Sequence, residues 1–217
     1  MSKILPIASS YTILVSALYL MGFWSELNIN FLEYITLTEV AVISIGSLIS
    51  SFGLLLLSSF ISEIYIRPVM PIGGGRDTPE GKFMRKWWKV VYFPLIILAA
   101  YTVYSGKPMS SFFLAIVISP VLGIWFANTG FLSDVISNDN VRYSIVLVAV
   151  QIAFFSFPIG EIKALELKSS EVKNQVKIEE KTYTYLGKLG NNVFLWDNNM
   201  KHVKQLSYLP KEIIYIP

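Results

Sequence analysis

Few residues of this chain have the type and spacing that acid–base, nucleophilic or metal chemistry requires. The chain has no cysteine, which excludes disulfides, thiolate metal sites and cysteine nucleophiles. His202 is the single histidine, so neither a catalytic triad nor a histidine-rich metal site is expected, and its place beside a predicted turn favours a surface strand residue. Glu179 and Glu180 are adjacent in a predicted strand, where their carboxylates point to opposite faces. We predict no catalytic, cofactor-binding or metal-binding residues, and a protein that is not an enzyme.

Two further features suggest chemistry and are better explained by local structure. The Gly73-Gly74-Gly75-Arg76 stretch lacks the glycine spacing and the Gly-Lys-Ser/Thr ending of a phosphate-binding loop. Glu39 lies at the edge of an apolar run, where a carboxylate could serve ion transport. However, Thr36 precedes Glu39 at the spacing of a capping box, which marks a helix start. We favour the capping role for Glu39.

The elements that would carry any site are apolar segments long enough to cross a membrane. Hydrophobic residues make up 53% of the chain and charged residues 15%, a composition outside the range of soluble proteins. Five runs contain no Asp, Glu, Lys or Arg: 4–25, 40–62, 90–106, 108–133 and 143–160. A membrane-spanning helix needs about 20 apolar residues, and two of the runs, 90–106 and 143–160, lie near the lower limit of about 17. The sequence therefore predicts four or five spans.

The second span is predicted to begin at the capping box and to continue to residue 66, before Pro68. Small residues recur along it at helical spacing, and such residues let helix backbones approach closely inside a membrane. This set is Gly46, Ser47, Ser51, Ser58 and Ser62. We predict that it packs against other helices; a pore lining or a face between copies of the chain is the alternative.

Two segments beside the spans carry aromatic residues that suit a membrane surface. Residues 22–34 are too polar to span and too aromatic for a free loop, so we expect them to lie along the interface, anchored by rings such as Trp24 and Tyr34. A segment directly before the third span interleaves basic and aromatic residues and is predicted to anchor the chain on anionic lipid headgroups. Its anchor residues are Lys82, Arg85, Lys86, Trp87, Trp88 and Lys89.

Lysine and arginine are concentrated on one side of the predicted spans, and such residues accumulate on the cytoplasmic side. With five spans, one side holds eight of them and the other holds one, Lys107. The eight are Lys3, Arg67, Arg76, Lys82, Arg85, Lys86, Lys89 and Arg142. We therefore predict a cytoplasmic N-terminus and a periplasmic tail after residue 162, although the tail carries nine lysines, because six acids accompany them and folded domains cross largely regardless of charge. A four-span arrangement would put the tail in the cytoplasm.

The tail changes from apolar helical runs to short alternating strands. Val176 and Ile178 are expected on one face of the first strand and Lys177 on the other. Further strands are predicted over 182–187, 192–197, 202–207 and 212–216, with turns at Gly190-Asn191, Asp197-Asn198-Asn199 and Leu209-Pro210-Lys211. Five or six strands in so short a segment imply a small barrel or bent sheet, SH3-like in size and strand order. Such a domain is marginally stable alone, so we expect it to dock on the membrane domain or on neighbouring copies.

The predicted fold class is a membrane all-α protein of four to five transmembrane helices with a small C-terminal all-β module. The helical domain covers residues 1–162 and the β-domain covers 163–217. The spans are predicted at about 4–25, 36–66, 88–106, 108–131 and 143–161.

A membrane platform with a binding-sized β-domain and no catalytic set predicts a non-enzymatic protein of a bacterial-type inner membrane. We expect an anchor, a sensor or a protective subunit of the defence or immunity type, which binds membrane lipids and a protein partner or further copies of itself, and not nucleic acid. Candidate partner contacts are Tyr183, Tyr185, Trp196 and Tyr208, although each of them singly is more often part of a core. The alternatives are an oligomeric ion channel or pore and, more weakly, a small transporter, since no internal repeat is found.

Overall fold

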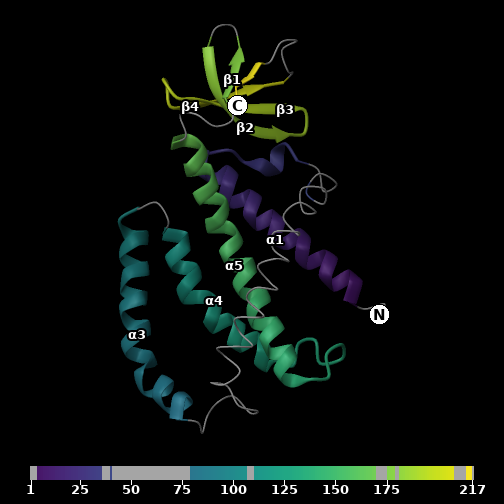
Figure 1. Ribbon diagram of the computed structural model, residues 1–217, viewed down its shortest axis with the longest axis vertical. Coiled ribbons are helices and arrows are strands. Elements are labelled where there is room, and N and C mark those ends of the chain that lie inside the picture. The colour runs from purple at the N-terminus through teal and green to yellow at the C-terminus, as the bar shows by residue number, and fades with distance from the viewer. Residues whose placement is uncertain are drawn as a thin grey trace. The chain divides into compact units, whose positions relative to one another are not determined.

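The computed structural model describes residues 4–35, 40, 79–106, 110–169, 175–178, 181–207 and 214–216 of the chain. These residues form long helices, one short 3₁₀ helix and one β-sheet (Figure 1). The helices are α1 (Ile4–Glu26), η1 (Phe31–Glu33), α3 (Pro79–Tyr104), α4 (Ser110–Asn128) and α5 (Asp139–Ser169). The strands are β1 (Gln175–Ile178), β2 (Lys181–Leu189), β3 (Asn192–Asp197), β4 (His202–Leu206) and β5 (Ile214–Ile216).

Three of the described helices are long and apolar enough to cross a membrane. They are Pro6–Glu26 of α1, Ser110–Asn128, which is α4, and Val141–Ser169 of α5. Helix α3 contributes a shorter apolar stretch, Phe93–Tyr104, after a first part that carries most of its charged residues. These helices fit the membrane class that the composition predicts, and α3 corresponds to a predicted span near the lower length limit.

Helix α5 continues past the predicted end of the fifth span at residue 161 and ends at Ser169. The extension is amphipathic, because Ala164 and Leu167 are buried whereas Lys163 and Glu166 are exposed and form an ion pair, with 2.8 Å between Nζ and Oε2. Buried residues three apart share one face of a helix, which explains why the helix persists where the sequence becomes polar. The first residues of the predicted β-domain are therefore helical.

The sheet is antiparallel throughout, with the strand order β4-β3-β2-β1-β5. Strands β1 to β4 follow one another as a meander, and β5 returns to pair with β1. The strands lie where the alternation of apolar and polar residues predicts them, and Val176 and Ile178 are buried on either side of the exposed Lys177. The register of β2 against β3 shifts between Tyr185 and Gly187, which marks a bulge.

Each face of the sheet contributes residues to a buried cluster. One face contributes to a cluster within the sheet, made of Val176, Ile178, Tyr183, Val193 and Leu195. The other face contributes Phe194 and the partly buried Trp196 to a cluster shared with helix residues. Because successive strand residues point to opposite faces, the unbroken apolar run from residue 193 to residue 196 serves both clusters.

Contacts divide the chain into two compact units, residues 1–15 with 45–155 and residues 16–44 with 156–217. Helices α1 and α5 each contribute their first part to one unit and their last part to the other. In the first unit α3 and α4 run side by side (Figure 1), and the Tyr11 hydroxyl donates a hydrogen bond to the Ala149 carbonyl at 2.9 Å. The second unit combines the C-terminal halves of α1 and α5 with the sheet.

In the second unit α1 and α5 cross at two glycines. A methyl group on Gly22 would collide with the carbonyl of Phe157, and one on Gly160 would collide with the carbonyl of Tyr19. The two backbones therefore touch without intervening side chains, which is the way small residues bring membrane helices together.

The same unit fixes the relative direction of the two helices. Gly160 of α5 lies against Tyr19 of α1, and nearer the C-termini Lys168 of α5 pairs with Glu26 of α1. The contacts advance in the same direction along both helices, so α1 and α5 run parallel and end together.

Candidate functional site: the junction between helix ends and sheet

The second compact unit contains a continuous apolar core that joins two helix ends, the segment after α1 and the sheet. We call this core the junction. Its buried residues are Leu20, Phe23, Trp24, Leu27, Phe31, Ala164, Leu167, Leu186, Leu189 and Phe194. Figure 1 shows the strands stacked on the C-terminal ends of α1 and α5. The small sheet is thus docked on the helical part of the chain, as its size predicts.

Trp24 connects the helical and the sheet sides of the junction. Its side chain is 3% exposed, and its ring meets Phe23 and Phe194 edge to face, with centroids 5.0 Å and 5.1 Å apart. Such aromatic pairs contribute about 0.5–1.5 kcal/mol each beyond the area that they bury. On β2, Gly187 has φ +151°, and a Cβ there would lie 3.4 Å from the Trp24 ring. That distance is an ordinary contact, so it is the backbone φ, which L side chains rarely adopt, that favours glycine at the bulge.

The aromatic rings at the end of α1 and in the segment after it are not used as the sequence predicts. Residues 22–34 are predicted to anchor at the membrane interface, but Trp24, Leu27 and Phe31 are buried in the junction, and Tyr34 packs against it. The prediction of interfacial anchoring by Trp24 is therefore wrong. The physical reason is that the sheet supplies an apolar surface, which removes the indole from water more completely than the headgroup zone does.

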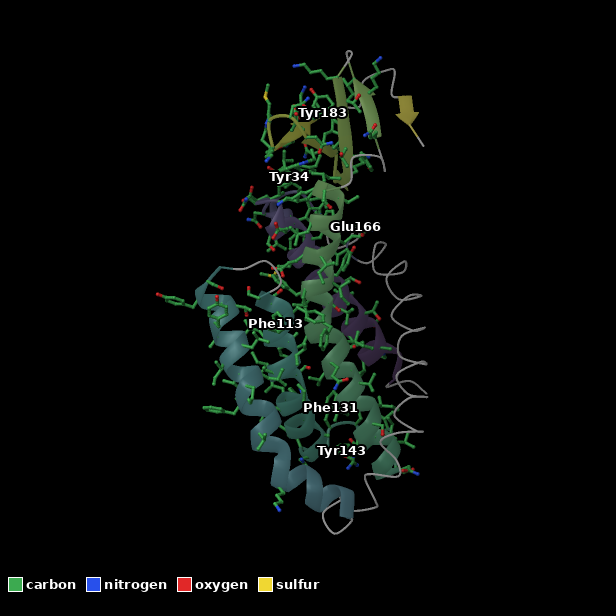
Figure 2. The ribbon with its side chains drawn as sticks, turned by 60° about the vertical axis from the view of Figure 1, so that its left-hand side comes forward. Tyr34, Phe113, Phe131, Tyr143, Glu166 and Tyr183 are labelled. Atoms are coloured by element: carbon green, nitrogen blue, oxygen red, sulfur yellow. The ribbon has the colours of Figure 1, made fainter. Side chains whose placement is uncertain are left out.

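Tyr34 holds the same segment to the β2–β3 hairpin. Its ring lies edge to face with that of Phe194, with centroids 5.3 Å apart, and its hydroxyl donates to Gln205 Oε1 at 3.4 Å. The hairpin turn contains Gly190 at φ +55°, where a Cβ would lie 2.5 Å from the Tyr34 carbonyl oxygen. Figure 2 shows Tyr34 at the base of the strands and Tyr183 among them. The close approach requires glycine at this turn.

An ion pair lies where α1, α5 and β3 meet. The Lys168 ammonium donates to Glu26 Oε1 at 2.8 Å and to the Glu26 carbonyl oxygen at 2.5 Å. It also lies 5.5 Å from the centroid of the Trp196 ring, within the range of a cation–π interaction. The Lys168 and Glu26 side chains are 22% and 27% exposed, whereas those of the Lys163–Glu166 pair on the outer face of α5 are 47% and 52% exposed.

The β3–β4 turn is organised by Asp197. Its carboxylate accepts hydrogen bonds from the backbone N–H groups of Met200, at 3.0 Å, and Asn199, at 2.9 Å. The bond from Met200, together with that from Asn199, holds the pKa of Asp197 below its usual range, while burial opposes the shift. Lys201 closes the turn in a left-handed conformation, with φ +52°.

The candidate partner contacts divide between core and surface. Tyr183 is 4% exposed and belongs to the cluster within the sheet, so it is a core residue. Tyr185 is partly buried against the same cluster, and Trp196 is partly buried against the junction. Tyr208 lies outside the described residues. The structure thus brings the tyrosines of β2 to one core and Trp196 to another, and does not gather the set into one surface.

The remaining predicted residues are only partly described. Of the anchor set, Lys86 has an exposed side chain on α3, and the side chains of Lys82, Arg85, Trp87, Trp88 and Lys89 are outside the described part. The small-residue set of Gly46, Ser47, Ser51, Ser58 and Ser62, and also Glu39, Glu179 and Glu180, lie outside it as well. His202 is exposed at the start of β4, which confirms its prediction as a surface strand residue.

The junction is suited to holding elements together rather than to chemistry. It is apolar except for one ion pair at its edge. Within the described ranges, no group of three or more His, Asp and Glu side chains could hold a metal ion. The absence of metal and catalytic residues stays a prediction for the chain as a whole.

Sequence reasoning missed the junction, although two signals for it are present. The run Val193-Phe194-Leu195-Trp196 is apolar at every position, which is typical of a strand covered on both faces. The segment 22–34 is rich in large apolar residues, which could cover the second face of such a strand. Neither signal alone identifies the other as its partner, because they are far apart in the sequence.

No protein-family model, curated protein or solved structure matches this chain.

Proposed function

We propose that this chain is a non-enzymatic, multi-pass inner-membrane protein that presents a fixed β-module to a protein partner, as an anchor, a sensor or a protective subunit of the defence type. The observation that supports this proposal best is the junction. Its core includes residues of α1, η1, α5, β2 and β3, so the module is held on the helix ends rather than tethered by a loop. A pre-positioned surface loses less freedom on binding and therefore suits a docking subunit.

The parallel direction of α1 and α5 supports five spans and a periplasmic module. Two spanning helices that run parallel and end together must be separated by an odd number of crossings. Helices α3 and α4 supply two candidate crossings, and the apolar run 40–62 would supply the third. Together with the eight-to-one distribution of basic residues, this supports a cytoplasmic N-terminus and a module outside the cytoplasm.

We further propose that the module is a small SH3-like barrel. The meander of β1 to β4, with β5 returning to β1, has the strand order that the sequence analysis expects for such a barrel. The buried cluster within the sheet, opposite the face that meets the junction, would be the interior of the barrel.

The partner surface is best sought at the β3–β4 turn. In the described part of the module, Met200 is the large apolar residue that is exposed, at 65%, and it sits on a turn that Asp197 holds rigid. A photo-reactive amino acid at Met200, in the full chain in its native membrane, should form a cross-link to a second protein. The same amino acid at Ile159, an exposed residue in the apolar part of α5, is the matched control and should not.

Two other outcomes of this experiment would replace the docking function with another function. A cross-link from Met200 to a second copy of the chain would favour a homo-oligomer. If Met200 forms no protein cross-link and the purified protein passes ions in planar bilayers, the channel function replaces the docking function. A deletion after residue 169 is not a clean test, because it would expose Trp24 and Phe31 and destabilise the helix ends.

A further inference from the structure

The side chain of Lys168 connects three elements, because it contacts both Glu26 and Trp196. Lys168 is in the last turn of α5, Glu26 ends α1, and Trp196 is in β3. The Lys168 ammonium donates to the Glu26 carboxylate and to its backbone carbonyl, and it faces the Trp196 ring.

Glu26 is unfavourable where it stands unless a cation accompanies it. The C-terminal end of a helix carries partial negative charge and unpaired carbonyl groups, so an acid in the last turn is repelled. Helix α1 has no basic residue in its last turn. Lys168 supplies from α5 both the missing charge and a donor for a terminal carbonyl of α1. Separating α1 from α5 would therefore leave Glu26 uncompensated.

The same separation would also affect the sheet. Trp196 is packed against the junction, and the cation that lies over its ring belongs to α5. An exposed ion pair contributes little because water replaces each partner readily, but this pair is more sheltered than Lys163–Glu166 and is shared with an aromatic ring. Its contribution is thus tied to all three elements being in place.

We propose that Lys168 is a latch that couples the end of α1, the end of α5 and strand β3, so that loss of the Glu26–Lys168 pair loosens α1 and the sheet together, although the apolar junction still holds them. This coupling does not depend on which partner the module binds.

The test is hydrogen–deuterium exchange of the full chain in lipid nanodiscs, followed in two regions, residues 23–31 and residues 192–197. Lys168→Met should raise exchange in both regions by a similar factor, about fivefold, because one opening event exposes both. Glu26→Gln should do the same. The double variant should exchange no faster than the faster single variant, which is the sign of a coupled pair. Lys168→Arg should restore slow exchange.

The chain offers a matched control on the same helix. Lys163→Met removes the exposed Lys163–Glu166 pair and should leave both regions unchanged. The proposal is overturned if the Glu26 and Lys168 effects are additive, if only one of the two regions responds, or if Lys163→Met produces the same change. Should Lys168→Met fail to insert, Glu26→Gln keeps the side-chain shape and decides the question alone.

Discussion

Trp24 is the residue in which the helical and the sheet parts of the junction meet. An indole between two spans is usually explained by the headgroup zone, where its N–H stays hydrated. Here the ring is buried against Phe23, Phe194 and the backbone at Gly187. Its role is therefore to hold the sheet on the helix ends, and its removal should destabilise the whole second unit.

We predict that Trp24→Ala lowers the free energy of unfolding by about 3–5 kcal/mol, because it leaves a cavity between two packed elements. Equilibrium unfolding in detergent micelles measures the change. Trp125 of α4, which is 59% exposed, is the matched control, and Trp125→Ala should cost less than about 1 kcal/mol in the same assay. Equal losses for the two variants would contradict the assignment of Trp24 to the junction.

Asp197 gives the β3–β4 turn a dependence on pH. Its pKa is lowered in the folded protein by the hydrogen bond from Met200 and then that from Asn199, so its ionised form favours folding. The stabilisation is present above the unfolded pKa of about 3.9 and is lost as the pH falls through the lower folded value. Amide exchange of residues 197–202 should therefore rise, relative to that of β2, when the pH is lowered from 5 towards 3. In Asp197→Asn this rise should be absent, and a rise of the same size would show that another group is responsible.

At the scale of elements, the strands and most helices could be predicted because their signals are local. Short apolar–polar segments bounded by turn residues predict the strands, and runs without charge predict α1, α4 and α5. The observed end of α5 lies beyond the predicted end at residue 161 because Ala164 and Leu167 are buried in the junction, and no local sequence pattern reveals this burial. The same holds for Trp24, whose partner Phe194 is far away in the chain. What sequence reasoning missed is the pairing of surfaces from distant segments.

The crossing of α1 and α5 is a second feature that only the fold reveals. Gly22 has no small residue four positions before or after it, whereas Gly160 lies four residues from both Ser156 and Ala164, a spacing typical of membrane-helix contacts that does not identify α1 as the partner. Together the two glycines let one backbone rest on the other.

We predict that Gly22→Ala and Gly160→Ala each lower the unfolding free energy of the protein by about 1–3 kcal/mol, because the added methyl group meets backbone carbonyls that cannot move aside easily. Thermal unfolding in detergent measures the effect. Gly123→Ala in α4 is the control, since its Cβ would lie 3.5 Å from Leu147, an ordinary contact. That variant should be neutral or slightly more stable, as alanine favours a helix over glycine. A Gly123→Ala loss equal to that of Gly22→Ala would argue against the close crossing.

At the scale of the whole molecule, the parallel direction of α1 and α5 constrains which segments lie on the same side of the membrane. Counting apolar runs leaves four or five spans open, because 90–106 and 143–160 lie near the lower length limit of a span. The direction of α1 relative to α5 is independent of that count. If both cross the membrane, then the segment after α1 and the sheet lie on one side, and the connection before α5 lies on the other.

The absence of cysteine allows this arrangement to be tested with single cysteines in the full chain. Leu32, Ser133 and Met200 are exposed and lie after α1, before α5 and in the module, respectively. A membrane-impermeant maleimide added to cells with a permeable outer membrane should label Leu32→Cys and Met200→Cys, and should label Ser133→Cys only after the inner membrane is opened. Labelling of all but Ser133→Cys follows from parallel spans with a periplasmic module. If Ser133→Cys alone is labelled, the module is cytoplasmic although the helices remain parallel, and if Leu32→Cys and Met200→Cys report opposite sides, α1 and α5 do not both cross the membrane.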